Sequence, residues 1–439
     1  MKKELLMAAG VALATLALAL ALIRYFAPTL LGVPVDLRLV QLAETQPAFF
    51  AGIFRMEDIR SLDLNVNDPI MGVRGKPLHA NLVLKGPNDV LGFRNANVPN
   101  VADILAIGDS QTYGLNASMP LNWPHQLDAL LSRKHQSSRV YSMAVGGWSA
   151  PQYLHAAQIA GVLRPRVMIV AFYAGNDALE SFIHAYGSEH WAHLRPDGKL
   201  RAADAPSVQL PVPRNKQWHV PLDDGLGTIM LVDLRRASMR DHIAVDAGWQ
   251  IMKLVATQLS EQAAAYQAHL LVALIPTKES AYAKLLHQRG VQVPQEFAEL
   301  LAEESLRSVD FASHVTGLPG TQFIDVATPM QDALLAGEAI YPGDFDGHPN
   351  AAGYERIAAS FERAAAALVP SYPCGPVRFE SRDGLWHHAI ASGDGHYWLL
   401  DTPPDGAVSV PTVTINERMV EGMRQLPEAP GNREHPRCG

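Results

Sequence analysis

The sequence is poor in cysteine. Its 439 residues contain only two, Cys374 and Cys438, and both lie toward the C-terminal end. Two cysteines exclude a cysteine-rich zinc module and a scaffold built on several disulfides. In an oxidising compartment the two thiols could pair, and otherwise they would stay free.

An excess of positive charge is also missing. The chain carries 36 Lys and Arg against 44 Asp and Glu, a formal net charge of -8, and no stripe of basic residues occurs. This composition gives no sign of nucleic-acid binding. His184, His190 and His193 lack a carboxylate or cysteine at metal-ligand spacing, so we expect them to be solvated or to face substrate. We therefore expect no metal and no cofactor.

A long hydrophobic run begins directly after the N-terminus. Lys2 and Lys3 precede an uncharged stretch from Leu5 to Ile23. Its length is near the roughly 20 residues that a membrane-spanning helix needs, and exceeds the apolar part of a cleavable signal peptide. We expect residues 1–26 to be an uncleaved, single-pass anchor in the inner (cytoplasmic) membrane, with a cleaved signal peptide as the alternative. The positive-inside tendency then predicts that the main domain is periplasmic or extracellular.

From residue 101 onward, short apolar runs alternate with stretches of helical periodicity. The candidate strands are Ile104–Ile107, Val140–Val145, Val167–Phe172, Leu270–Ile275 and Phe323–Val326. Alternation of this kind is typical of a parallel sheet that is covered by helices. We predict an α/β fold of three layers, α/β/α, with a parallel sheet of the flavodoxin-like kind.

The remaining segments are arranged around this unit. We expect residues 27–100 to be a connector that packs on the core, and residues 101–370 to form the main domain. Residues 178–248 interrupt the alternation and have the length of a functional lid or binding loop. Residues 371–439 form a C-terminal extension whose Pro-, Glu- and Arg-rich end we expect to be disordered.

Three predicted strands end in polar motifs that contain glycine. These are Gly108-Asp109-Ser110, Gly146-Gly147 and Gly175-Asn176-Asp177. Ligands of open parallel sheets bind outside the carboxyl ends of the strands. We therefore expect the polar residues of the three motifs to meet at one edge of the sheet.

Four segments resemble the sequence blocks of the SGNH, or GDSL-type, hydrolases. In the family's order they are Gly108–Gly114, Ser142–Ser149, Gly175–Asp177 and Asp344–Gly353. The resemblance covers roughly residues 90 to 370. A lone Gly-Asp-Ser is a weak signal, but four blocks in order, three of them directly after apolar strands, are specific.

The resemblance implies a serine esterase that works through an acyl-enzyme. Ser110 would be the nucleophile and His348 its general base. The oxyanion hole would consist of the backbone N–H groups of Ser110 and Gly147 and the side-chain amide of Asn176.

The last block departs from the usual family pattern. An Asp commonly lies three residues before the histidine, but Phe345 occupies that position. The Asp-x-His spacing of Asp346 resembles that of SGNH-like alginate O-acetyltransferases, so Asp346 is the first candidate for the triad acid. Asp344 is the fallback, and a Ser–His dyad held by a backbone carbonyl is the third option.

Two further residues are candidates for substrate binding. Trp148 directly follows the second block and could either stack on a sugar ring or belong to the core. Lys278 follows the fourth predicted strand and could meet an anionic substrate or form a surface salt bridge.

Together these features predict an extracytoplasmic serine esterase or deacylase acting on an ester of a cell-envelope glycan, lipid or small molecule. One alternative is a polysaccharide O-acetyltransferase. Another is a non-catalytic carbohydrate-binding or scaffold protein on the same fold. The expected partners are an acyl ester, with a polysaccharide as a candidate acceptor, and the membrane through the N-terminal helix. The sequence sets no oligomeric state.

Overall fold

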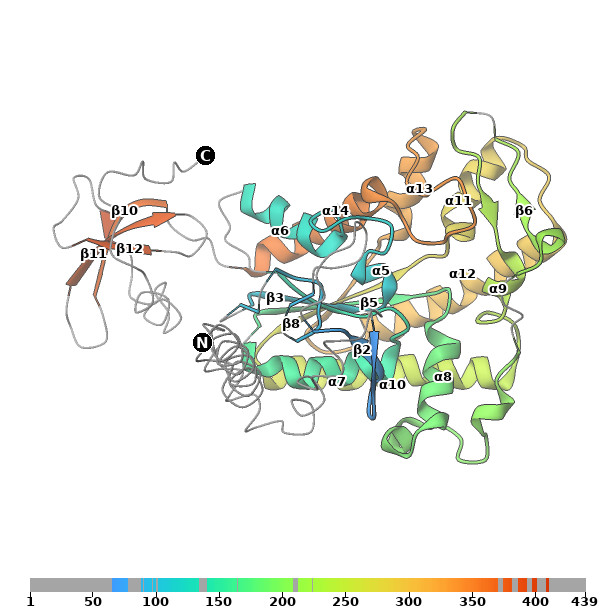
Figure 1. The fold of residues 1–439 in the computed structure, drawn as a ribbon, viewed down its shortest axis with the longest axis horizontal. Coiled ribbons are helices and arrows are strands. Elements are labelled where there is room, and N and C mark those ends of the chain that lie inside the picture. The colour runs from blue at the N-terminus through green and yellow to red at the C-terminus, as the bar shows by residue number, and fades with distance from the viewer. Residues whose placement is uncertain are drawn as a thin grey trace, which may run out of the picture. The chain divides into compact units, whose positions relative to one another are not determined.

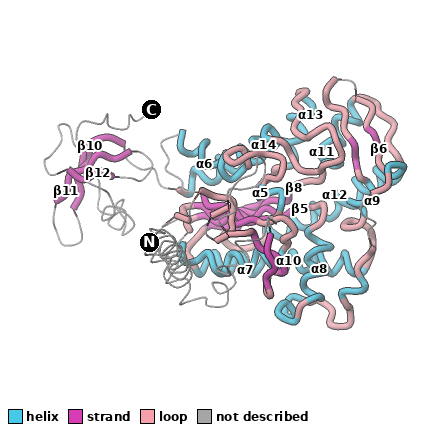
Figure 2. The backbone as a smooth tube through the Cα atoms, viewed as in Figure 1, coloured by secondary structure: helices cyan, strands magenta, loops and turns pink. Residues whose placement is uncertain are grey.

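The computed structural model divides into two compact units, Met1–Arg55 and Met56–Gly439, and every described residue belongs to the second (Figure 2). The described residues are 65–77, 88–89, 91–96, 98–99, 102–133, 140–163, 165–207, 212–222, 224–369, 374–380, 386–392, 397–400 and 408–409. The predicted anchor and Cys438 lie outside them, so the membrane span stays a prediction and the two alternatives for the cysteines, paired or free, stay open. No described helix combines the length and apolar character needed to span a membrane.

A five-stranded parallel sheet forms the centre of the fold, as predicted. The strand order is β4-β3-β5-β8-β9. The strands are β3 (Ile104–Gly108), β4 (Val140–Ala144), β5 (Val167–Tyr173), β8 (His269–Ile275) and β9 (Thr321–Ile324). Every residue of β3 and β5 is buried, because helices cover both faces of a parallel sheet.

Helices pack on the two faces of the sheet and complete the three layers (Figure 1). On one face, α7 (Ala150–Ala160) packs against α10 (Ile243–Ala265). On the other, α6 (Trp123–Arg133) packs against α14 (Ala351–Leu368). The domain also contains α11 (Lys278–Gln288), α12 (Gln295–Thr316) and α13 (Ala327–Leu335).

Aromatic side chains fill the space between sheet and helices. Phe172 of β5 packs edge-on against Tyr153 of α7 and Phe311 of α12, with ring centroids 5.3 and 5.1 Å apart. Trp123 and Phe361 join α6 to α14 at 5.0 Å. Truncating a buried aromatic of this kind costs about 3–5 kcal/mol, so these contacts fix the strands that carry the polar motifs.

The interrupting segment 178–248 contains more regular structure than its sequence indicated. Helix α8 (Asp177–Gly187) begins directly at the third motif. Short elements follow: η3 (Glu189–Leu194), η4 (Ala202–Asp204), η5 (Arg214–Lys216), β6 (Trp218–His219), β7 (Ile229–Met230) and α9 (Val232–Arg236). Elements this short are too brief to give a clear periodicity, which is why the sequence did not reveal them.

Among the described residues, three further sheets lie outside the central one, and the smallest of them is the antiparallel pair β6-β7. The hairpin β1 (Asn65–Asp68) and β2 (Gly72–Gly75) contacts the domain through the Val73 carbonyl, which accepts a hydrogen bond from the Trp148 indole. Near the C-terminus, four strands pair in the order β12-β11-β10-β13. They are β10 (Cys374–Glu380), β11 (Trp386–Ser392), β12 (Tyr397–Leu400) and β13 (Val408–Ser409).

Candidate active site

Ser110 lies on a tight turn at the carboxyl end of β3, the strand between β4 and β5. It begins the short helix α5 (Ser110–Tyr113), which the Asp109 carboxylate caps by accepting a hydrogen bond from Gln111 N at 2.8 Å. A Cβ on Gly108 would overlap the Thr112 side chain, so the turn requires glycine there. Strand and turn together hold the Ser110 hydroxyl, half-buried, at the edge of the sheet.

His348 reaches Ser110 from 238 positions away in the sequence. Its Nε2 lies 2.8 Å from Ser110 Oγ, within the distance for direct proton transfer. Asn116 donates to the His348 carbonyl at 2.9 Å, and Asn350 caps α14 directly after it. The structure thus brings together the two residues predicted as nucleophile and base.

Asp346 contacts the other side of the imidazole ring. Its Oδ1 lies 2.6 Å from His348 Nδ1 and accepts the His348 backbone N–H at 2.9 Å. Asp344 instead accepts the backbone N–H of Asp346 and makes no described contact with the ring. Phe345, at the position where the family commonly has its acid, has 55% of its surface exposed. Of the two carboxylates, Asp346 is therefore the one that contacts the imidazole ring among the described residues.

The environment keeps the Asp346 carboxylate ionised. Burial by itself would raise its pKa, but the hydrogen bonds from the ring and backbone of His348 outweigh burial and lower the pKa to about 2. A carboxylate beside Nδ1 favours the tautomer with its proton on Nδ1. Nε2 is then free to accept the proton of Ser110 Oγ–H.

The second and third motifs follow the two strands that flank β3. Gly147 follows β4 and has φ +85°, and a Cβ built there would meet no atom within 4 Å. This leaves open space beside its backbone. Asn176 follows β5, and its Oδ1 is buried without a hydrogen-bond partner among the described residues. The three motifs therefore end neighbouring strands, as the sequence predicted.

Three carboxyl groups that the sequence did not assign to the site lie around these motifs. Burial raises the pKa of Asp109 to about 6, against the opposing effect of the Gln111 N–H and His348. Burial and the nearby Asp109 carboxylate also raise the pKa of Asp177, which accepts from Tyr153 Oη and Tyr173 N at 2.9 Å each. Burial raises the pKa of Glu180 to about 7. No spacing rule would have indicated these shifts, because they depend on burial.

The two residues predicted to bind substrate do not face solvent. Trp148 is 1% exposed, donates from Nε1 to Val73 O at 2.7 Å, and packs on Phe93 at 5.8 Å between ring centroids. Lys278 is also 1% exposed and donates to the backbone carbonyls of Asp344 and Asp346. Both lie in the loop between α13 and α14, residues 336–350, which carries His348 and is called the histidine loop below. Both substrate-binding predictions are therefore wrong: Trp148 is a core residue, and Lys278 contacts the protein itself.

The histidines of the interrupting segment show one contact of interest. His184 on α8 places Nε2 3.4 Å from the Gly147 carbonyl, and burial lowers the pKa of His184. His190 and His193 contact the ring of Trp191. Within the described part of the chain, no group of three His, Cys, Asp or Glu residues has the geometry for a metal ion.

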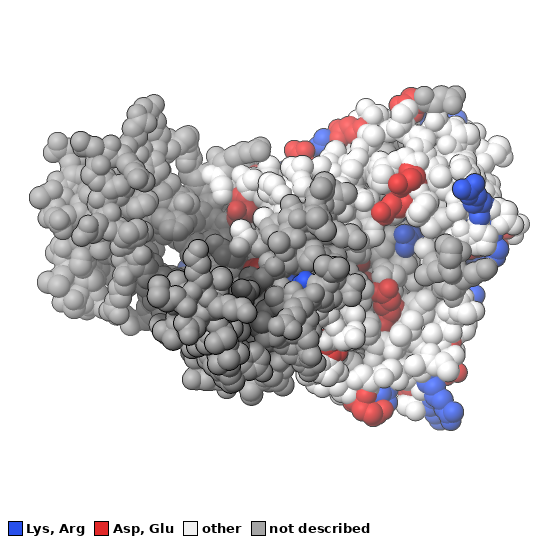
Figure 3. Space-filling model, viewed as in Figure 1, with Lys and Arg blue, Asp and Glu red and all other residues white. Residues whose placement is uncertain are grey.

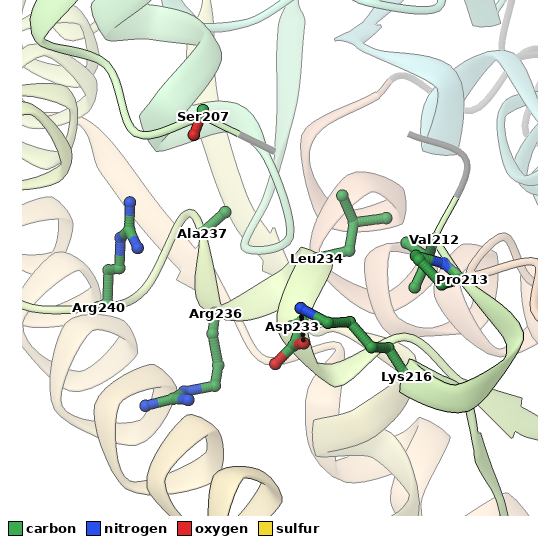
Figure 4. A pocket seen from close by; sticks show the side chains of 9 residues that line it. All are labelled: Ser207, Val212, Pro213, Lys216, Asp233, Leu234, Arg236, Ala237 and Arg240. Atoms are coloured by element: carbon green, nitrogen blue, oxygen red, sulfur yellow. Dashed lines mark ion pairs between the residues drawn. The ribbon is translucent and has the colours of Figure 1, made fainter. Parts of the chain in front are cut away.

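A cavity of about 390 Å³ lies beside α9 (Figure 4). Its lining contains an ion pair of Lys216 with Asp233 at 3.4 Å, together with Arg236 and Arg240. Neither Ser110 nor His348 lines it, so it is separate from the site described above. On the face drawn in Figure 3, acidic and basic side chains of the described residues are interspersed, without a basic patch.

Several solved structures are similar to part of this chain. The crystal structure of TesA has 13% identity and a TM-score of 0.34, with 61% of this chain and 99% of that chain covered. An α/β hydrolase named LAE5, from the metagenome of Lake Arreo, has 13% identity and a TM-score of 0.32, with 62% and 98% covered. A catalytic mutant of Axe2, an acetylxylan esterase from Geobacillus stearothermophilus, has 12% identity and a TM-score of 0.33, with 61% and 96% covered. No curated protein matches.

A sequence profile gives the decisive comparison. The profile of the GDSL-like lipase/acylhydrolase family matches residues 106–356, more than half of the chain. The matched stretch contains Ser110, Gly147, Asn176 and His348. The resemblance found in the sequence is thereby confirmed: this chain belongs to the GDSL-like lipase/acylhydrolase family and is an ester-hydrolysing enzyme.

Proposed function

We propose that Ser110, His348 and Asp346 form the catalytic triad of this esterase. One observation carries the proposal: an unbroken chain of short contacts, 2.6 Å from Asp346 to His348 and 2.8 Å from His348 to Ser110. Three residues in this order supply a nucleophile, a base and a group that fixes the base.

The reaction proceeds in two halves. His348 Nε2 takes the Ser110 hydroxyl proton as Oγ attacks the ester carbonyl carbon, and a tetrahedral oxyanion forms. Nε2 then gives that proton to the leaving alcohol as the ester C–O bond breaks, which leaves an acyl-serine. Water enters, loses a proton to Nε2 and attacks the acyl carbon, so that the carboxylic acid leaves and Ser110 regains its proton.

The oxyanion is stabilised by donors from the three motifs. These are the backbone N–H groups of Ser110 and Gly147 and the side-chain amide of Asn176. Glycine suits the second position because a side chain there would occupy the open space that the acyl group needs. One such donor typically contributes about 10²–10³ in kcat.

The substrate is proposed to be an ester of the cell envelope, reached by an enzyme anchored through residues 1–26. The support is the uncharged run Leu5–Ile23 behind two lysines. A C-terminal alkaline phosphatase fusion would be active if the domain is extracytoplasmic. A C-terminal green fluorescent protein fusion, which fluoresces when the domain is cytoplasmic, is the control. An inactive phosphatase fusion together with an equally abundant, fluorescent green fluorescent protein fusion would contradict this placement.

A second candidate function is acyl transfer to a polysaccharide hydroxyl. The observation that favours it is the pairing of His348 with an acid two residues before it, the Asp-x-His arrangement of the alginate O-acetyltransferases it resembles. Both reactions share the acyl-serine and differ only in whether water or a sugar attacks it. The two reactions are separated by supplying a labelled acetyl donor with and without an oligosaccharide. Label on the oligosaccharide would show transfer, whereas label found only in free acetate would show that the enzyme catalyses hydrolysis and no transfer.

The triad assignment is tested by replacing its nucleophile. We expect Ser110→Ala to abolish turnover of p-nitrophenyl acetate and to remove the acetyl adduct that mass spectrometry detects on the peptide containing Ser110. Ser132→Ala changes an exposed serine on α6 and serves as the matched control. Wild-type turnover by Ser110→Ala would refute the assignment.

A further inference from the structure

A buried lysine holds the loop that carries His348. Lys278 is the first residue of α11, directly after β8 and its cap Thr277. Its Nζ donates to the carbonyl oxygens of Asp344 at 2.8 Å and Asp346 at 2.9 Å, and to Thr228 Oγ1 at 3.2 Å. An ammonium has three N–H donors, so this set of partners uses all of them.

The same loop is tied down by the segment before α9. Thr228 Oγ1 lies 3.0 Å from the Asp344 carbonyl and 3.1 Å from the Pro342 carbonyl. Ile229 N donates to the Asp344 carbonyl at 3.3 Å. The backbone on both sides of Phe345 is therefore fixed from outside the loop, while the Phe345 ring is largely exposed.

Arg235 of α9 packs against the next residue of the loop. A Cβ on Gly347 would overlap the end of the Arg235 guanidinium, so a larger residue there would make the Arg235 side chain shift. Arg235 lies 3.8 Å from Glu279, the neighbour of Lys278, and 5.6 Å from the centre of the Tyr173 ring. The buried Lys278 and the partly buried Arg235 thus lie against the turn Asp346-Gly347-His348 from the side of α9 and α11.

Burying an ammonium group is expensive, which makes its partners informative. Taking a charged amine out of water costs several kcal/mol unless its surroundings compensate. Lys278 hydrogen bonds to two carbonyls and a hydroxyl, all of which lie in or against the histidine loop, and to no carboxylate. A methionine of similar length would fill this space without that cost. The presence of a charged lysine at position 278 therefore indicates that the histidine loop must be held in a defined position.

We propose that Lys278 is a positioning residue for the proposed triad. By fixing the carbonyl groups of Asp344 and Asp346, it sets the Asp346 carboxylate against Nδ1 of His348, and through the ring it sets Nε2 against Ser110. It touches neither substrate nor reacting atoms. This inference rests on the proposed function, because it assigns Lys278 to the same acyl-transfer chemistry.

The position of Lys278 also couples the site to pH. Burial lowers the pKa of Lys278 to about 8, and the nearby positive charge of Arg235 lowers it further. The negative charges of Glu279, Asp344 and Asp346 act in the opposite direction and are outweighed. Above that pH the neutral amine keeps two N–H donors for three acceptors. Activity should therefore decline as the pH rises through about 8.

The experiment compares Lys278→Met with Lys284→Met. Lys284 lies on the same helix but is half-exposed, with Asp332 3.9 Å away, so its variant makes the same chemical change outside the loop. For Lys278→Met we expect kcat on p-nitrophenyl acetate to fall about 10–100-fold with KM within about twofold, because small misplacements of catalytic groups cost rates of this size. Labelling of Ser110 by a fluorophosphonate should slow in proportion, and the decline near pH 8 should disappear. Lys284→Met should retain wild-type values.

A second variant guards against a failure to fold. Thr228→Val keeps the shape of the side chain and removes the hydroxyl that Lys278 and the loop share, so we expect about a 3–10-fold loss of kcat and a slower labelling rate. Wild-type kcat, labelling rate and pH profile in folded Lys278→Met, or in Thr228→Val if the first variant is not folded, would overturn the positioning role. Turnover by Ser110→Ala in the same assay would instead refute the proposed function.

Discussion

Asp109 and Asp346 stand on opposite sides of the Ser110–His348 pair and behave in opposite ways. Asp109 is fully buried at the turn after β3, and burial raises its pKa to about 6. Asp346 lies partly exposed in the histidine loop. There the hydrogen bonds from His348 outweigh burial and lower the pKa to about 2.

The difference follows from the deeper burial of Asp109 and from the donors that each carboxylate receives. Asp109 accepts one backbone N–H at 2.8 Å and a weak hydrogen bond from Ser110 Oγ at 3.4 Å. Asp346 accepts both the ring and the backbone N–H of His348, and its own backbone carbonyl accepts a hydrogen bond from the buried Lys278. When the environments of two carboxyls push their pKa values apart, their roles separate as well. Asp346 serves the base, and Asp109 serves the turn.

Of the three changes proposed to test this comparison, removing His348, which lies between Ser110 and Asp346, should have the largest effect on kcat. We expect His348→Ala to lower kcat on p-nitrophenyl acetate by at least about 10⁴-fold, because nucleophile and base act as one unit. The double variant with Ser110→Ala should be no slower than either single variant. Steady-state rates of all three variants test this, and additive losses would mean that the two residues act independently.

Neutralising the acid of the triad should have the next largest effect. Asp346→Asn is expected to lower kcat by about 10²–10⁴-fold, because an amide can favour the wrong tautomer of His348 and cannot stabilise its charged form. The measurement is kcat with KM on the same ester. Asp344→Asn is the matched control, since Asp344 makes no described contact with the ring. A greater loss in the control would return Asp344 to the role of triad acid.

Neutralising Asp109 should have the smallest effect on rate and a distinct effect on stability. We expect Asp109→Asn to lower kcat less than about tenfold, because the amide oxygen can still cap Gln111 N. The folded state of the wild type holds this proton more tightly than the unfolded chain does. Asp109 therefore costs stability as the pH rises from about 4 to about 6, by up to about 3 kcal/mol.

The stability prediction is checked by thermal melting of wild type and Asp109→Asn at pH 4 and pH 8. Relative to wild type, the variant should be more stable at pH 8 than at pH 4. A difference in Tm that stays constant between the two pH values would show that Asp109 is ionised in both states. The contrast with Asp346 would then lose its basis.

The motifs could be predicted from the sequence because each is local. Gly108-Asp109-Ser110 and its two counterparts stand directly after buried strands, and parallel strands bring their ends to one edge without further information. The insertion was harder, because α9, β6 and β7 are too short for periodicity to reveal. Trp148 and Lys278 were misassigned for a related reason. Whether a side chain at a strand end faces solvent depends on what packs over it.

By itself, the sequence predicted the α/β alternation and the family, and it singled out Ser110 and His348, which the structure brings to 2.8 Å from each other. It left Asp344 and Asp346 as competing acids, because both precede His348 by a few residues. Only the tertiary structure shows which of the two contacts the His348 ring, because the bend of the loop brings Asp346 to 2.6 Å from Nδ1. That bend is held by hydrogen bonds from Lys278, 66 and 68 positions away in the chain, and such contacts leave no trace in local spacing.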